Sequence, residues 1–265
     1  MMNKRGISFL FALLMILSVF LGISMITTPM SLNEKTTIVP SGERNNIKNS
    51  LRIFNYDDAY ILIENSTILG TVEIGAYSVV RFRNVTFGTM GPAPIFISEQ
   101  AKVYFEDVKF MYDLILVATG NARVFFDQVD VSGGVELNAS DNAFVSFKNL
   151  TAMGYSLIMM WNESTVEIDD YMLQGPTDVY TYDDSDLTLR NLILLDDLNI
   201  ISYSNGTLLL ENIDSDFMVY PIMYAGSLII NDVNAEYLYV DTYGNATATI
   251  SNCAIGTEFW PSAYS

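Results

Sequence analysis

Hydrophobic and polar residues alternate in short runs along most of the chain, and these runs recur at a nearly constant distance. A run of the form apolar-x-apolar-x-amide or acid occurs nine times, and its central residues lie 23, 21, 21, 21, 21, 21, 20 and 20 positions apart. A degenerate tenth copy occupies Ile61–Asn65. Such regular spacing predicts a solenoid in which each copy is one coil. The nine runs are Val80–Asn84, Val103–Asp107, Val124–Gln128, Val145–Asn149, Val166–Asp170, Leu187–Asn191, Leu208–Asn212, Leu228–Asp232 and Ala248–Asn252.

The alternation inside each copy predicts three short strands. Apolar residues two positions apart, such as Val80 and Phe82, face one side while their neighbours face the other. After the amide the alternation resumes one step out of phase, which indicates a bend, and a third pair such as Leu114 and Leu116 follows a turn. We therefore expect an all-β fold, a parallel β-helix of nine to ten coils of about 21 residues. A leucine-rich repeat consensus and a six-residue sub-period are both missing.

The segments VRFRNVTF, VYFEDVKF, VSFKNLTA, LTLRNLIL and LLLENIDS resemble coil repeats of the right-handed parallel β-helix, or pectin-lyase-like, superfamily. The resemblance covers residues 60–256 and implies the fold rather than one activity, because lyases, glycosidases, tailspikes, adhesins and inert surface proteins share it. It also implies an internal asparagine ladder. The matching positions are Asn84, Asp107, Gln128, Asn149, Asp170, Asn191, Asn212, Asp232 and Asn252.

The two ends of the chain differ from this repeat. Lys4 and Arg5 precede an uncharged apolar run over residues 7–26, which predicts a signal peptide or an N-terminal membrane anchor in residues 1–28. We assign residues 29–59 to an N-terminal cap, 60–256 to the β-helix and 257–265 to a short tail. The rest of the chain is then extracytoplasmic, secreted or anchored by its N-terminus. Because solenoid ends need cover, we expect self-association through the C-terminal coil or a longer parent chain.

Composition removes several classes of function. The chain has no histidine, which excludes Ser-His-Asp and Cys-His nucleophile pairs, and its one cysteine cannot form an intrachain disulfide. The formal net charge is −18, from 31 acidic and 13 basic residues, so a nucleic-acid partner is not expected. Contact with a membrane is expected only through the N-terminal segment.

Candidate catalytic and metal-binding groups are sparse. Acidic doublets such as Asp183 and Asp184 fall at positions that hold turn residues in other coils, so we interpret them as solvated turns and assign no catalytic residue. We expect no cofactor. One calcium site is conceivable, because Asp178 and Asn199 share an outward column in adjacent coils with Asp197 close by.

Seven N-x-[ST] sequons predict glycosylation of an exported chain. Asn65, Asn84 and Asn149 occupy ladder positions and are expected to be shielded. The acceptor candidates lie in turns or on an outer column: Asn138, Asn162, Asn205 and Asn245.

An aromatic column is the one candidate ligand site. It holds one residue per coil, just before the turn: Trp161, Tyr182, Tyr203, Tyr224 and Tyr243. These rings form either an exposed track for a neutral glycan or a stacked structural ladder, and the structural interpretation is favoured.

Two functions fit the sequence. The favoured one is a non-catalytic, glycosylated surface protein with an envelope-structural, adhesive or carbohydrate-contact role, whose partners are neutral glycans or other envelope proteins. The alternative is a secreted polysaccharide-degrading enzyme, a lyase or glycosidase, with a carboxylate-only site. The missing histidine, the few basic residues and the lack of a long irregular loop favour the first.

Overall fold

A computed structural model describes residues 37–38, 45–47, 50–55, 60–88 and 91–264. The regular secondary structure of these residues is entirely β-strand, and they contain no helix of the length and hydropathy needed to cross a membrane. The predicted signal peptide or anchor lies outside the described residues, as does much of the predicted N-terminal cap.

The strands follow one another around the coils in a repeating order. Their bounds are β1 (Thr37–Ile38), β2 (Asn45–Ile47), β3 (Leu51–Asn55), β4 (Tyr60–Glu64), β5 (Ser66–Ile68), β6 (Val72–Ala76), β7 (Val79–Arg83), β8 (Thr86–Phe87), β9 (Ile95–Ile97), β10 (Lys102–Phe110), β11 (Leu114–Ala118), β12 (Arg123–Val131), β13 (Val135–Ala139), β14 (Phe144–Ala152), β15 (Ser156–Met160), β16 (Thr165–Leu173), β17 (Thr177–Thr181), β18 (Asp186–Leu194), β19 (Leu198–Ser202), β20 (Thr207–Met223), β21 (Ser227–Tyr243), β22 (Thr247–Ser251) and β23 (Ala254–Tyr264).

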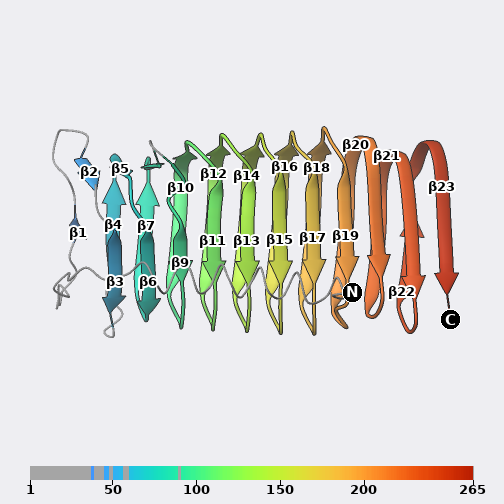
Figure 1. Cartoon of the computed structure of the whole chain (residues 1–265), viewed down its shortest axis with the longest axis horizontal. Helices are drawn as coiled ribbons and strands as arrows, with labels where there is room; N and C mark the ends of the chain where they lie inside the picture. The colour runs from blue at the N-terminus through green and yellow to red at the C-terminus, as the bar shows by residue number, and fades with distance from the viewer. Residues whose placement is uncertain (1–36, 39–44, 48–49, 56–59, 89–90, 265) are drawn as a thin grey trace, which may run out of the picture. The chain divides into compact units, whose positions relative to one another are not determined.

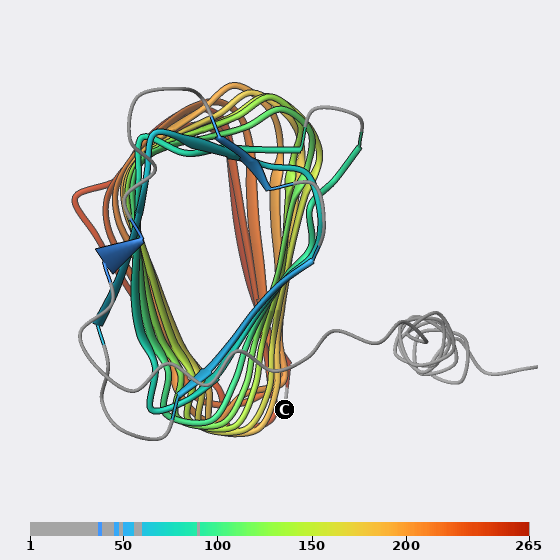
Figure 2. The same cartoon turned by 90° about the vertical axis from the view of Figure 1, so that its left-hand side faces the viewer.

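Each strand pairs in parallel with the equivalent strand one coil further along the chain. Thus β10 pairs with β12 and β11 with β13, with register partners 21 residues apart, such as Val103 and Val124. Figure 1 shows these strands side by side along the solenoid, and Figure 2 shows the coils superimposed around a common interior. The predicted all-β parallel solenoid of about ten coils is confirmed, including the degenerate copy at Ile61–Asn65, which forms β4 and its corner.

Three strand segments make up one coil, as predicted. In β10 the first segment runs to Glu106 and the second begins at Val108, because Asp107 has no register partner at the bend. The third segment is β11, and in β20 and β21 all three join into one continuous strand. The inward side chains form columns that fill the core.

The content of one core column changes along the solenoid. In the early coils the first strand carries stacked phenylalanines, with ring centroids of Phe105 and Phe126 4.5 Å apart and planes 7° from parallel. Phe82 and Phe147 extend this stack at its two ends. From Ile168 onward the same column is aliphatic. Its later members are Leu189, Leu210, Ile230 and Ile250.

The expectation of an internal amide ladder is wrong. All nine ladder residues, and Asn65 before them, are exposed and have φ between 51° and 58°. A left-handed residue interrupts the strand alternation, so the side chain at the bend turns outward and the next residue resumes the core column. Asn and Asp recur there because they tolerate this conformation better than other side chains.

Both ends of the solenoid extend beyond the predicted range of residues 60–256. At the N-terminus β1, β2 and β3 pair with β4, β5 and β6, so the described parts of the predicted cap are strands of a further coil. At the C-terminus β23 pairs with β21 as far as Tyr264. Sequence alternation was too short there to reveal the strand.

Close packing at one corner requires glycine. A Cβ on Gly134 would collide with the backbone oxygen of Tyr155, and one on Gly154 would lie 2.7 Å from the backbone nitrogen of Gly134. These glycines lie between the second and third strands of successive coils and let the turns stack.

Candidate functional site

The predicted aromatic column is a continuous stack on the outside of the solenoid. Successive ring centroids from Trp161 to Tyr243 lie 4.1 to 5.5 Å apart, and neighbouring planes are within 14° of parallel. Tyr264 adds a sixth ring, 4.7 Å from Tyr243, which sequence analysis missed because it lies in the assumed tail. Tyr203 is 39% exposed and Tyr224 is 41% exposed, so the stack is neither buried nor fully open.

The stacking of the rings determines which of their surfaces a ligand can contact. Rings in parallel planes this close cover one another's faces and present their edges and hydroxyls to solvent. A sugar packs against an aromatic face, and only the two end rings, Trp161 and Tyr264, have a face that no member of the stack covers. The geometry therefore favours the structural interpretation over a glycan track along its whole length.

A second set of tyrosines donates to carboxylates: Tyr220 and Tyr239 lie on the outward face of the third-strand segments, and Tyr155 lies in the turn just before β15. Three phenol hydroxyls donate hydrogen bonds to carboxylates one coil away or slightly more: Tyr155 to Asp178, Tyr220 to Asp241 and Tyr239 to Glu258, each at 2.8 Å. Sequence reasoning missed these pairs because the third strand was located only by its apolar residues. Spacings of 19 to 23 residues between Tyr and Asp or Glu would have been the signal.

These carboxylates hold the phenols in their neutral form. The hydrogen bond to Asp241 is the largest cause that raises the pKa of Tyr220 to about 12, followed by desolvation. For Tyr155 desolvation comes first and the hydrogen bond to Asp178 second, and both raise its pKa. At neutral pH all three phenols are therefore uncharged hydrogen-bond donors.

The side chains of the candidate calcium site already form hydrogen bonds within the protein. Both carboxylate oxygens of Asp178 accept hydrogen bonds, one from Tyr155 and one from the Asn199 amide nitrogen at 3.1 Å. Asp197 accepts a hydrogen bond from the backbone nitrogen of Met218 at 3.1 Å. Asn199 thus turns a donor toward Asp178, whereas calcium requires its oxygen. Within the part of the chain that the structure describes, no three His, Cys, Asp or Glu side chains gather as a metal site would require.

The turn carboxylates also form intercoil hydrogen bonds. Asp183 lies at φ 59° and accepts from the backbone nitrogen of Asn162 at 3.2 Å, and Asp184 accepts from the Asn205 side chain at 3.2 Å. Both are exposed. Their solvated turn position agrees with the prediction, and each helps to hold two coils in register.

Aromatic residues on the first strands of the early coils have cationic neighbours. Arg81 lies 5.1 Å from the ring centroid of Tyr104, and its Nε is 3.5 Å from Glu106. Lys102 lies over Tyr104 and Phe125, at 5.3 and 5.7 Å. The early coils thus combine an aromatic ring, a carboxylate and a cation from the same chain.

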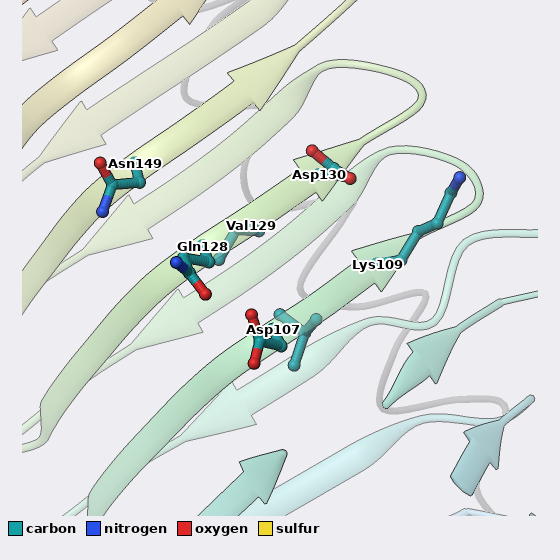
Figure 3. A pocket seen from close by; sticks show the side chains of 7 residues that line it. Asp107, Lys109, Gln128, Val129, Asp130 and Asn149 are labelled. Carbon is teal, nitrogen blue, oxygen red and sulfur yellow. The ribbon is translucent and has the colours of Figure 1, made fainter. Parts of the chain in front are cut away.

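A shallow depression lies over the bend in three neighbouring coils. Its volume is about 340 Å³, and Figure 3 shows polar side chains spread along neighbouring strands rather than enclosing a chamber. Val108 and Val129 are buried beneath it. Such an open surface does not surround a substrate. Its lining residues are Asp107, Val108, Lys109, Gln128, Val129, Asp130 and Asn149.

The glycosylation candidates differ in exposure. Asn162, Asn205 and Asn245 are exposed in turns, whereas Asn138 is half-buried on the third-strand face. The three sequons expected to be shielded, Asn65, Asn84 and Asn149, are exposed, because the amide column faces outward. All seven sequons therefore have their asparagines at least partly accessible to solvent.

No protein-family model, curated protein or solved structure matches this chain. The pectin-lyase-like resemblance therefore remains a prediction beyond the solenoid fold itself.

Proposed function

We propose that the protein is a non-catalytic, extracytoplasmic surface protein, glycosylated and exported through its N-terminal segment, with an envelope-structural or adhesive role. The observation that carries this proposal is the regularity of the coils. From β10 to β23 the described strands follow one another through short turns, with no long insertion over any face. Enzymes usually place their catalytic groups on loops above a rigid scaffold, and these coils offer none.

The charged groups support the same proposal. Outward carboxylates also bond to a neighbouring coil: Asp169 accepts a hydrogen bond from the Asn191 amide at 2.6 Å, and Glu211 accepts one from Arg190 at 2.8 Å. Groups that hold the stack together are poor candidates for acid and base catalysis on a sugar bond.

The decisive experiment combines activity and location. Purified protein is incubated with a panel of neutral and acidic polysaccharides while unsaturated-product absorbance and reducing ends are followed, and the native protein is labelled on intact cells. We expect no turnover and surface labelling. Reproducible product release would instead establish the alternative, a carboxylate-only lyase or glycosidase.

Glycosylation provides a separate test. The intact mass of the natively produced protein should exceed the sequence mass and fall after enzymatic deglycosylation. Asn245→Gln should remove one glycan, because Asn245 lies in the exposed turn between β21 and β22. Asn142→Gln is the matched control, since Asn142 is an exposed turn asparagine outside any sequon.

Two partner proposals accompany this function. A neutral glycan would contact the open ring faces at the ends of the outer stack, so Tyr264→Ala should weaken its binding. Self-association would use β22 and β23, which pair on one side only, with β21, among the described strands. Light scattering of the purified protein tests the second proposal, because a stable monomer would contradict it.

A further inference from the structure

The last three coils carry an aromatic patch on the third-strand face. Tyr220, Tyr239 and Trp260 form one outward column in register, and Tyr224, Tyr243 and Tyr264 form a parallel column four residues further along each strand. Between them lies a central column of Ile222, Asp241 and Ser262. Side chains two residues apart share one face of a strand, so these residues form a grid about 13 Å wide.

This grid, which we call the Asp241 patch, has a carboxylate at its centre and aromatic rings on both sides. Asp241 accepts the hydrogen bond from Tyr220, and Glu258 accepts from Tyr239 at 2.8 Å and from the Trp260 indole at 3.3 Å. Trp260 is 59% exposed and Tyr264 is 54% exposed. The rim is therefore accessible to a partner molecule.

Among the residues that the structure describes, no ion pair or cation–ring contact joins a lysine or arginine to this patch. No lysine or arginine follows Arg190 in the sequence, whereas residues 191–265 contain nine carboxylates. In the early coils the same combination of ring and carboxylate is completed by an internal cation, as in Tyr104, Glu106 and Arg81. The Asp241 patch has two parts of that arrangement and lacks the third.

We propose that the Asp241 patch is a docking surface for an extended, arginine- and lysine-rich segment of a partner protein. A guanidinium or ammonium group would pair with Asp241, its alkyl chain would pack against the edges of the stacked rings, and a second cation of the segment would reach the open face of Tyr264. Charge complementarity selects this partner over an acidic one, because the end of the solenoid is uniformly negative. The proposal goes beyond the surface role, and it does not depend on whether the protein is exported.

The test uses the full protein and an acetylated hexa-arginine amide as the probe, measured by calorimetry at low and high salt. A net charge of −18 will attract any polycation weakly, so binding of the probe alone does not test the proposal. The test is whether the probe binds at the Asp241 patch. We expect Asp241→Asn to weaken binding about tenfold. Asp214→Asn removes the same charge from the second-strand face, where Asp214 accepts from Asn234, and should change binding less than about twofold.

Tyr264→Ala removes an exposed ring at the edge of the patch with little risk to folding, and it should weaken binding of the probe severalfold. Unchanged thermal melts of all variants exclude unfolding as the cause. Equal effects of Asp241→Asn and Asp214→Asn would overturn the proposal, as would binding unaffected by either. Asp241→Asn should leave binding of an uncharged oligosaccharide at Tyr264 unchanged, which distinguishes this proposal from the glycan contact proposed above.

Discussion

The early coils stack aromatic residues inside the core, on the first strands, whereas the late coils stack them outside, at the ends of the third strands. Before about residue 150, phenylalanines stack inside the core and the chain's own cations lie over aromatic rings outside. After that point the core column is aliphatic, the stack is outside, and phenols donate to carboxylates. Coil repetition therefore fixes the backbone only, because equivalent columns can carry quite different chemistry without altering the register.

Truncating the inner stack should produce the largest effect. Phe126 is buried between Phe105 and Phe147, so Phe126→Ala should lower the free energy of unfolding by about 3–5 kcal/mol. Leu189→Ala, in the same column of the late coils, is the matched control and should cost about 2–5 kcal/mol. Chemical denaturation measures both. A loss under about 1 kcal/mol for Phe126→Ala would break the comparison, since the inner stack would then not be structural.

Removing one ring of the outer stack should lower the free energy of unfolding by less than removing one ring of the inner stack. Tyr203→Ala should lower the free energy of unfolding by about 1–2 kcal/mol, because Tyr203 stacks on Tyr182 and Tyr224 but keeps 39% of its surface exposed. Tyr77→Ala, at an exposed tyrosine without a stacked ring in the described coils, should cost less than about 0.5 kcal/mol. Equal losses for these two variants would show that outer stacking contributes nothing.

The left-handed corners should behave alike in both halves. Asn191→Leu should cost about 1–2 kcal/mol, because a branched side chain disfavours φ 53°, whereas Asn191→Gly should be close to neutral. Asn84 is the equivalent corner of the early coils and should give the same pattern under denaturation. If glycine were as harmful as leucine at these corners, their side-chain hydrogen bonds would matter more than backbone conformation.

Alkaline titration should give the smallest effect and affect the late coils first. The pKa of Tyr220 is raised to about 12 from an ordinary value near 10, so the folded state favours its neutral form. That contribution to stability is complete below pH 10 and is lost as the pH rises through 12. Asp241→Asn removes the main cause, so Tyr220 should ionise at lower pH in an ultraviolet titration. Tyr220→Phe identifies the affected group, and an unchanged titration in Asp241→Asn would contradict the assignment.

Much of the fold was predictable because the core columns repeat strictly. The spacing of pairs such as Val103 and Phe105 located the strands, and Ile61–Asn65 was identified as a coil despite its poor match. The orientation of the amide column was not predictable from alternation, because a single left-handed residue shifts the phase and hydropathy does not reveal φ. The same residues, Asn and Asp, suit either a buried ladder or an exposed corner.

The candidate site was predicted in part. Five rings of the outer stack were found because they repeat at a fixed position, while Tyr264 was missed because the apolar residues of β23 do not alternate regularly. The phenol–carboxylate pairs were missed for a different reason. Tyr220 and Asp241 lie on different columns, two residues apart in register, so no single repeat position holds them both.

The parallel register also has a consequence for how the chain reaches this structure. Each strand finds its partner about 21 residues away, so no coil must wait for a distant part of the chain before it can form. Every completed coil then presents an edge on which the next one can grow, and folding can proceed from one end as a linear polymerisation within a single molecule. A chain emerging with its N-terminus first would meet these templates in the order in which it needs them.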